Sequence, residues 1–86
     1  MNEQQVLEDS IERMGMWVRK HPSGVLVIQQ GGEQFTIFPH VSRWTYRIGQ
    51  IGQAPHKSGF FSRNDVKMLV HKVLTWGWEN GAQANA

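Results

Sequence analysis

Cationic and aromatic side chains share the middle of this chain, where no Asp or Glu occurs between Gln34 and Asn64. Guanidinium and ammonium groups neutralise phosphates, and flat rings beside them stack on bases. This composition therefore predicts a surface for an anionic partner, either nucleic acid or an acidic face of a nucleic-acid-handling protein complex. The candidate binding residues are Arg43, Thr45, Arg47, His56, Lys57 and Arg63.

The charge of the whole chain is distributed in the same uneven way. Residues 1–12 contain four acidic residues and no Lys or Arg, whereas the remaining residues contain nine basic and three acidic ones. The net formal charge is only +2. The distribution, more than the sum, favours an acidic partner, provided that the acidic N-terminal segment does not cover the basic stretch.

A second interpretation of the aromatic residues stays open. Trp44, Tyr46 and Ile48 alternate with Thr45 and Arg47, and a period of two indicates a strand with one buried face. On that interpretation Trp44, Tyr46 and Phe61 belong to the core. The binding surface then narrows to the other strand face and to a basic loop from Gln50 to Arg63.

Tryptophan offers an alternative kind of surface. The chain has four tryptophans in 86 residues, and an exposed Trp is a typical anchor of a protein interface. Trp76, Trp78 and Trp17 are the candidates for such an interface, although burial in the core accounts for each of them equally well.

The residue types argue against catalysis and against metal binding. There is no cysteine, and the four histidines show neither an i,i+4 pair nor an HExxH motif. No GxSxG sequence and no phosphate-binding glycine motif is present. We therefore expect a protein that is not an enzyme, with no catalytic residues, no metal and no cofactor.

These residues must be positioned by a small number of elements. Leu7, Ile11 and Met14 recur at helical spacing, which predicts an amphipathic helix from Asn2 to Met14 that Gly15 ends. The expected strands are Met16–Lys20, Val25–Ile28, Gln34–Phe38 and Arg43–Ile48, with a loop over Ile51–Ser58 and a short segment over 59–61. Gly31-Gly32 indicates a tight hairpin. The four apolar residues of Val25–Ile28 indicate a strand that is either covered on both faces or central in the sheet.

The sequence Ser62-Arg63-Asn64-Asp65 fits a capping box, which predicts that a second helix begins at Ser62 and ends near Gly77. The predicted fold class is α+β: an N-terminal helix, a four- to five-stranded mainly antiparallel sheet, and a C-terminal helix packed on the sheet. We expect one domain over residues 1–78 and a flexible tail over 79–86.

Length and hydropathy set the remaining expectations. A chain of 86 residues suits one small core, and a homodimer is an arrangement that would support it. The polar N-terminus and the lack of any ~20-residue apolar stretch predict a soluble cytoplasmic protein with no membrane partner.

Two resemblances extend this interpretation. The run from Arg43 to Leu69, with Trp44-Thr45-Tyr46-Arg47 and then Gly59-Phe60-Phe61-Ser62 before a capped helix, resembles the small sheet-and-helix DNA-binding module of tyrosine integrases. The size and the α+β layout also resemble small phage-encoded inhibitors of host defence, including anti-CRISPR proteins. The resemblance to integrases implies DNA binding, and that to the inhibitors implies a protein target.

The first hypothesis is a small non-enzymatic binding or regulatory protein, encoded by a phage or mobile element, that engages its anionic partner through the basic strand and loop. The alternative is a protein-directed inhibitor or adaptor that acts through exposed Trp and helix faces.

Overall fold

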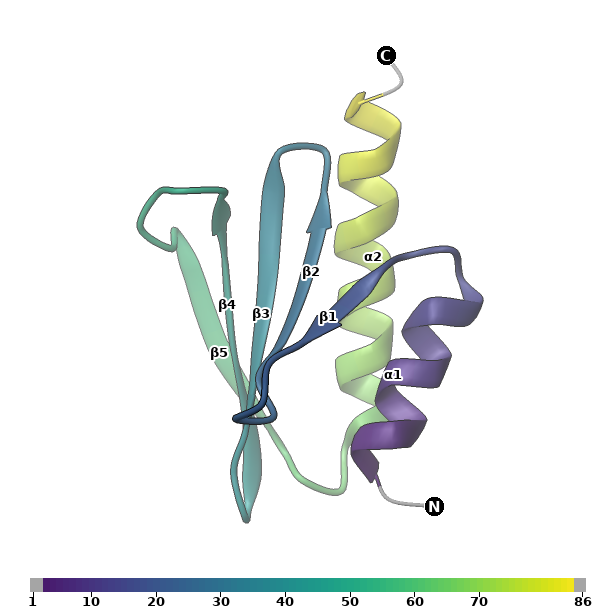
Figure 1. Cartoon of the computed structure of the whole chain (residues 1–86), viewed down its shortest axis with the longest axis vertical. Helices are drawn as coiled ribbons and strands as arrows, with labels where there is room; N and C mark the ends of the chain where they lie inside the picture. Colours follow the sequence, from purple (N-terminus) through teal and green to yellow (C-terminus); the bar gives the residue numbers. More distant parts are fainter. Residues whose placement is uncertain (1–2, 85–86) are drawn as a thin grey trace.

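The computed structural model describes residues 3–84 of the chain, with side chains described as far as residue 80 (Figure 1). The elements follow in the order α1 (Glu3–Arg13), β1 (Val18–Lys20), β2 (Leu26–Gln30), β3 (Glu33–Pro39), β4 (Arg43–Gln50), β5 (Lys57–Ser62) and α2 (Val66–Ala84). The five strands form one sheet in sequence order, and every neighbouring pair is antiparallel. This confirms the predicted α+β class.

Both helices lie on the same side of the sheet, which we call the helix side (Figure 1). Successive residues of a strand point to opposite faces, so every second residue contributes to the core. The opposite side, which we call the open face, has no element packed on it among the described residues. The strand residues buried on the helix side are Val18, Leu26, Ile28, Phe35, Ile37, Trp44, Tyr46 and Ile48.

Aromatic rings form the centre of this core. Phe35 stacks on Tyr46 with ring centroids 5.5 Å apart, and Trp76 of α2 meets Phe35 edge-on at 5.4 Å. Tyr46 also stacks on Phe61, at 5.7 Å. The fully buried Trp44 lies on the same side. The period-two interpretation of β4 is therefore confirmed for Trp44, Tyr46 and Ile48.

The acidic helix α1 lies against α2 and β1, on the helix side. It buries Leu7 and Ile11 and ends at Gly15, whose φ of 87° gives the left-handed conformation of a helix C-cap. Its predicted first residue, Asn2, lies outside the described residues. Because α1 is separated from the open face by the sheet, its carboxylates do not cover that face.

Three sequence-based boundaries are wrong. Residues 57–62 of the predicted basic loop form strand β5. Ser62 is therefore extended and does not cap α2, since Asp65 accepts the first helical hydrogen bond, from the amide of Leu69 (3.1 Å). Gly77 does not end α2, which continues to Ala84 and so includes residues 79–84 of the predicted tail; residues 85–86 lie outside the described part.

Tertiary packing explains two of these differences. The ring of Tyr46 lies directly against the backbone of Gly59 in β5. A larger residue at this position would collide with the ring, so the glycine belongs to the strand. The sulfur of Met16 packs against Gly77, where a larger residue would collide with it. This glycine therefore lets Met16 approach α2 closely and does not end the helix.

Of the two expectations for Val25–Ile28, coverage on both faces is wrong, whereas β2 does lie inside the sheet, between β1 and β3. Leu26 and Ile28 are fully buried, but Val27 lies on the open face and is only half-buried. Antiparallel sheets commonly leave one face to solvent. Within residues 3–84, no helix is long and apolar enough to span a membrane.

The β2–β3 turn provides a test of how α2 is seated. Gly31 and Gly32 have φ of 58° and 82°, and a Cβ on Gly31 would meet the backbone oxygen of Asn80 at 2.5 Å, whereas Gly32 faces open space. Gly32→Ala should cost about 1 kcal/mol of unfolding free energy from backbone strain alone. Gly31→Ala should cost about 3 kcal/mol, because the collision with α2 is added. Urea denaturation of both variants measures the difference, and equal losses would show that α2 does not rest on this turn.

Candidate nucleic-acid interface on the open face

The strand register gathers cationic, aromatic and small polar side chains on the open face. One row across the sheet consists of Arg19, Val27, Thr36, Arg47 and Ser58, and a second row consists of Phe38, Thr45 and Phe60. Arg43 pairs with Ser62 on the same face, while Gln29 and Gln34 extend the face at the other end. No strand residue on the open face is acidic, because Glu33, the acidic residue of the sheet, lies on the helix side with Phe35.

Each phenylalanine of the open face is covered by an arginine. The guanidinium carbon of Arg47 lies 4.9 Å from the ring centre of Phe38, and that of Arg43 lies 5.5 Å from the ring centre of Phe60. Such contacts contribute about 0.5–1 kcal/mol at exposed sites. Phe60 nevertheless remains 65% exposed. The face therefore presents two flat rings, each beside a cation.

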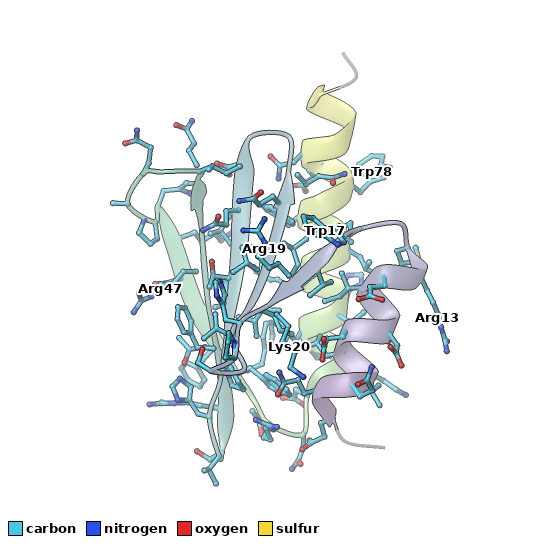
Figure 2. The ribbon with its side chains drawn as sticks, viewed as in Figure 1. Arg13, Trp17, Arg19, Lys20, Arg47 and Trp78 are labelled. Carbon is cyan, nitrogen blue, oxygen red and sulfur yellow. The ribbon has the colours of Figure 1, made fainter. Side chains whose placement is uncertain are left out.

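A third pair lies at the sheet edge. The guanidinium of Arg19 in β1 lies 5.4 Å from the ring centre of Trp17, which is 70% exposed. Figure 2 shows both side chains near β1, and Arg47 pointing away from the helices on the far side of the sheet. Both arginines of the row that begins at β1, Arg19 and Arg47, are thus paired with an aromatic ring.

A hollow of about 270 Å³ lies beside Arg47. Its walls come from β3, β4 and the loop before β5, where Ala54 and Pro55 pack against Gly49. Polar groups line it, among them Gln34 and Thr36. Gln34 accepts from Nε2 of the neighbouring Gln29 (3.0 Å) and donates to the hydroxyl of Thr36 (3.5 Å). Amide and hydroxyl groups of this kind can bond base edges.

The structure brings together three of the six predicted binding residues, namely Arg43, Thr45 and Arg47. Lys57 pairs with Ile48 and therefore lies on the helix side. His56 bonds through Nε2 to Oε1 of Glu33, at 3.0 Å, and Glu33 also belongs to the helix side. These two residues do not belong to the open face.

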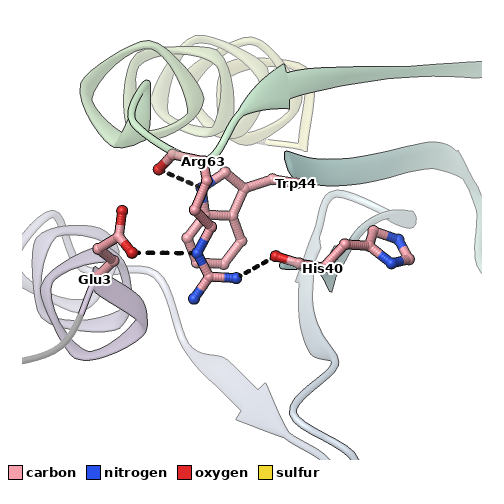
Figure 3. A network of polar contacts seen from close by, with 4 residues as sticks. All are labelled: Glu3, His40, Trp44 and Arg63. Atoms are coloured by element: carbon pink, nitrogen blue, oxygen red, sulfur yellow. Dashed lines mark hydrogen bonds and ion pairs between the residues drawn. The ribbon is translucent and has the colours of Figure 1, made fainter. Parts of the chain in front are cut away.

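Arg63 has a structural role instead (Figure 3). Its guanidinium lies 4.0 Å from the ring centre of Trp44, donates to the carbonyl of His40 (2.7 Å) and pairs with Glu3 of α1 (3.3 Å). Its own carbonyl accepts from Trp44 Nε1 (3.2 Å). Arg63 therefore ties α1, the β3–β4 turn and the start of α2 to the core.

The three candidate tryptophans separate into two groups. Trp76 is only 7% exposed and packs on Phe35, so it is a core residue and is not available as a surface anchor. Trp17 and Trp78 are 70% and 74% exposed and remain available.

The candidate binding residues lacked three residues of the open face that carry a ring or a cation, namely Phe38, Phe60 and Arg19. Phe38 has the same parity in β3 as Thr36, opposite to the buried Phe35 and Ile37, so the period of two could have assigned it. Arg19 alternates with the buried Met16 and Val18, so the same period, applied to the predicted strand Met16–Lys20, could have assigned it to the opposite face.

Replacing Arg63 should lower stability without changing the affinity of the folded protein for its partner. Arg63→Ala should lose about 2 kcal/mol of unfolding free energy, because one cation–π contact and one charged hydrogen bond disappear. Glu3→Gln, which removes only a half-exposed ion pair, should cost less than about 1 kcal/mol. Thermal and urea unfolding measure both. A stable Arg63→Ala protein with weakened binding would contradict this structural assignment.

Among residues 3–84, no three or more His, Asp or Glu side chains gather closely enough to hold a metal ion. Comparisons with models of protein families, with curated proteins and with solved structures found no match.

Proposed function

We propose that this protein is a non-enzymatic binding protein for single-stranded nucleic acid, and that the open face of the sheet is its binding surface. The observation that carries the proposal is the register itself. It places Arg19, Arg43 and Arg47 with Phe38 and Phe60 on one side of the sheet, with no acidic strand residue among them.

The distribution of charge supports an anionic ligand on this face. Four of the seven acidic residues belong to α1, behind the sheet, and Glu33 faces the helix side. Asp65 precedes α2 and Glu79 lies within it. A phosphate backbone approaching the open face therefore meets arginines without carboxylates beside them, which favours association through counterion release.

The shape of the site favours a single strand over a duplex. The major groove of DNA admits a helix or a two-stranded ribbon, whereas this face is the broad surface of a five-stranded sheet. Unpaired bases can instead lie flat on exposed rings. Phe38 and Phe60 flank Thr45 in one row, so their strands are about 10 Å apart. Two splayed bases would fit there, with the threonine hydroxyl between them.

The arginines would change partners on binding. In the free protein Arg47 covers Phe38 and Arg43 covers Phe60. A base that stacks on either ring would displace the guanidinium, which is long enough to reach a neighbouring phosphate. Loss of each cation–ring contact costs about 0.5–1 kcal/mol of favourable free energy. The base that stacks in its place contributes about 1–3 kcal/mol to binding.

The first test removes the cations. Arg43→Ala with Arg47→Ala should weaken binding of a mixed-sequence single-stranded oligonucleotide about tenfold or more, and should reduce the salt dependence of log K by about 1.4, or ~0.7 for each phosphate that is no longer neutralised. Arg13→Ala is the matched control, because the Arg13 side chain projects from α1 on the side that faces away from the sheet (Figure 2). Fluorescence anisotropy with DNA, RNA and duplex of the same sequence measures these effects. Absent binding by the parent, or an unchanged double variant, would refute the proposal.

The second test removes a ring. Phe60→Leu keeps an apolar side chain but abolishes stacking, and Phe60 is too exposed to contribute much to the core. Affinity for the single strand should fall about fivefold or more, while the salt slope stays that of the parent because the same phosphates are neutralised. A fall in slope without a fall in affinity at low salt would contradict the role given to this ring.

The exposure of Trp17 and Trp78 favours a second candidate function, that of a protein-directed inhibitor or adaptor. A protein interface anchored on Trp would respond little to salt. If this candidate is correct, Trp78→Ala should lose a partner captured from a lysate, whereas the Arg43 and Arg47 variants should keep it. Retention of that partner by Trp78→Ala would reject this candidate.

A further inference from the structure

A groove of about 1000 Å³ lies on the helix side of the sheet, between α2 and the ends of β3, β4 and β5. Its existence follows from the placement of the helices. Because α1 packs on α2 and β1, α2 alone covers the helix side of β4 and β5. The groove therefore lies behind the sheet as seen from the open face, and it shares Gln50 and Gln53, at the end of β4 and in the loop after it, with the hollow beside Arg47.

Part of the groove lining is apolar. Ile48 and Trp76 are buried beneath it, while Met68 of α2 and Ile51 of the β4–β5 loop remain 56% and 48% exposed. The Nε1 atom of Trp76 is buried and has no hydrogen-bond acceptor among the described residues. A ligand with an apolar body would cover the exposed methionine and isoleucine, and an oxygen on it could supply the missing acceptor.

Two lysines give the groove its charge. Lys57 and Lys72 both line it, and neither has an ion pair among residues 3–80. The Nζ atom of Lys72 lies 5.4 Å from the ring centre of Tyr46, and Tyr46 pairs with Gly59, two residues along β5 from Lys57. The two lysines therefore line the same part of the groove, beside Tyr46.

The acidic residues of the groove do not neutralise this part. Glu33 is held by His56 at 3.0 Å. Glu79 lies seven residues after Lys72 on α2, which is about 10 Å along the helix. An anion would consequently be drawn to the end that contains Lys57 and Lys72.

We propose that this groove binds a small organic anion with an aromatic or otherwise apolar body. The acidic group pairs with Lys57 and Lys72, and the body lies against Met68, Ile51 and the wall formed by Trp76. The volume is at the upper end of the range of small-molecule sites. This site is additional to the nucleic-acid surface and does not depend on that function.

Two fluorescent probes that share a ring system but differ in charge provide the test. They are the anion 8-anilinonaphthalene-1-sulfonate and the neutral N-phenyl-1-naphthylamine. The folded protein should bind the anion more tightly than the neutral probe. Lys57→Gln with Lys72→Gln should weaken binding of the anion about five- to tenfold, as expected for two partly exposed charge pairs, and leave the neutral probe unchanged. Lys67→Gln, on the exposed face of α2 and outside the groove, should change neither affinity.

A second variant keeps the test independent of charge. Thr75 is exposed and lines the groove, so Thr75→Trp should fill the groove and exclude both probes without disturbing the core. Circular dichroism and thermal unfolding confirm that each variant is folded. Absent binding by the parent, equal affinity for both probes, or an unaffected lysine variant would overturn the proposal.

The relation to the open face is tested with the same probe. Saturation with a single-stranded oligonucleotide should not displace the anionic probe, and Arg47→Ala should bind it as the parent does. Displacement by the oligonucleotide would show that the groove is part of the nucleic-acid path, and would overturn the inference of a separate site. Failure of oligonucleotide binding with retained probe binding would refute only the proposed function.

Discussion

The covering of the sheet on one side by both helices determines almost everything else in this protein. Side chains of a strand alternate between faces, so each residue that enters the core sends its neighbours to the opposite side. Burial of Trp44 and Tyr46 against the helices leaves Arg43, Thr45 and Arg47 on the open face. The aromatic cluster of Phe35, Tyr46, Phe61 and Trp76 fixes this choice, because a shift of one residue in β3, β4 or β5 would turn that strand's ring away from Trp76 and onto the open face.

The same constraint separates the charges of the chain. The acidic helix α1 packs behind the sheet, where Glu8 pairs with Lys20 and Glu3 with Arg63, so part of its charge is balanced locally. The arginines of the open face pair with rings instead of carboxylates. Their cationic charge is therefore left available to an external anion, and the proposed function follows from that availability.

Local patterns in the sequence predict the elements whose stability is itself local. Gly15 ends α1, Gly31 and Gly32 form the tight turn of a hairpin, and the alternation in β4 assigns three of the six candidate residues to one face. Elements that depend on distant contacts cannot be predicted in this way. Gly59 lies in β5 beneath the ring of Tyr46, and Gly77 lies in the interior of α2 against Met16. The structural role of Arg63 is equally hidden from local patterns, because its partners Glu3, His40 and Trp44 are 19 to 60 residues away.

The central claim is that single-stranded nucleic acid lies on the open face, and the most direct test is a titration of the ¹⁵N-labelled protein with a short single-stranded oligonucleotide, followed by NMR. At 86 residues the protein is small enough for every amide to be followed. The account predicts that shifts concentrate at Thr36, Phe38, Thr45, Arg47 and Phe60, while amides of α1 and the middle of α2 stay unchanged. Shifts centred on the helices or on Trp78, or no shifts at all, would contradict it.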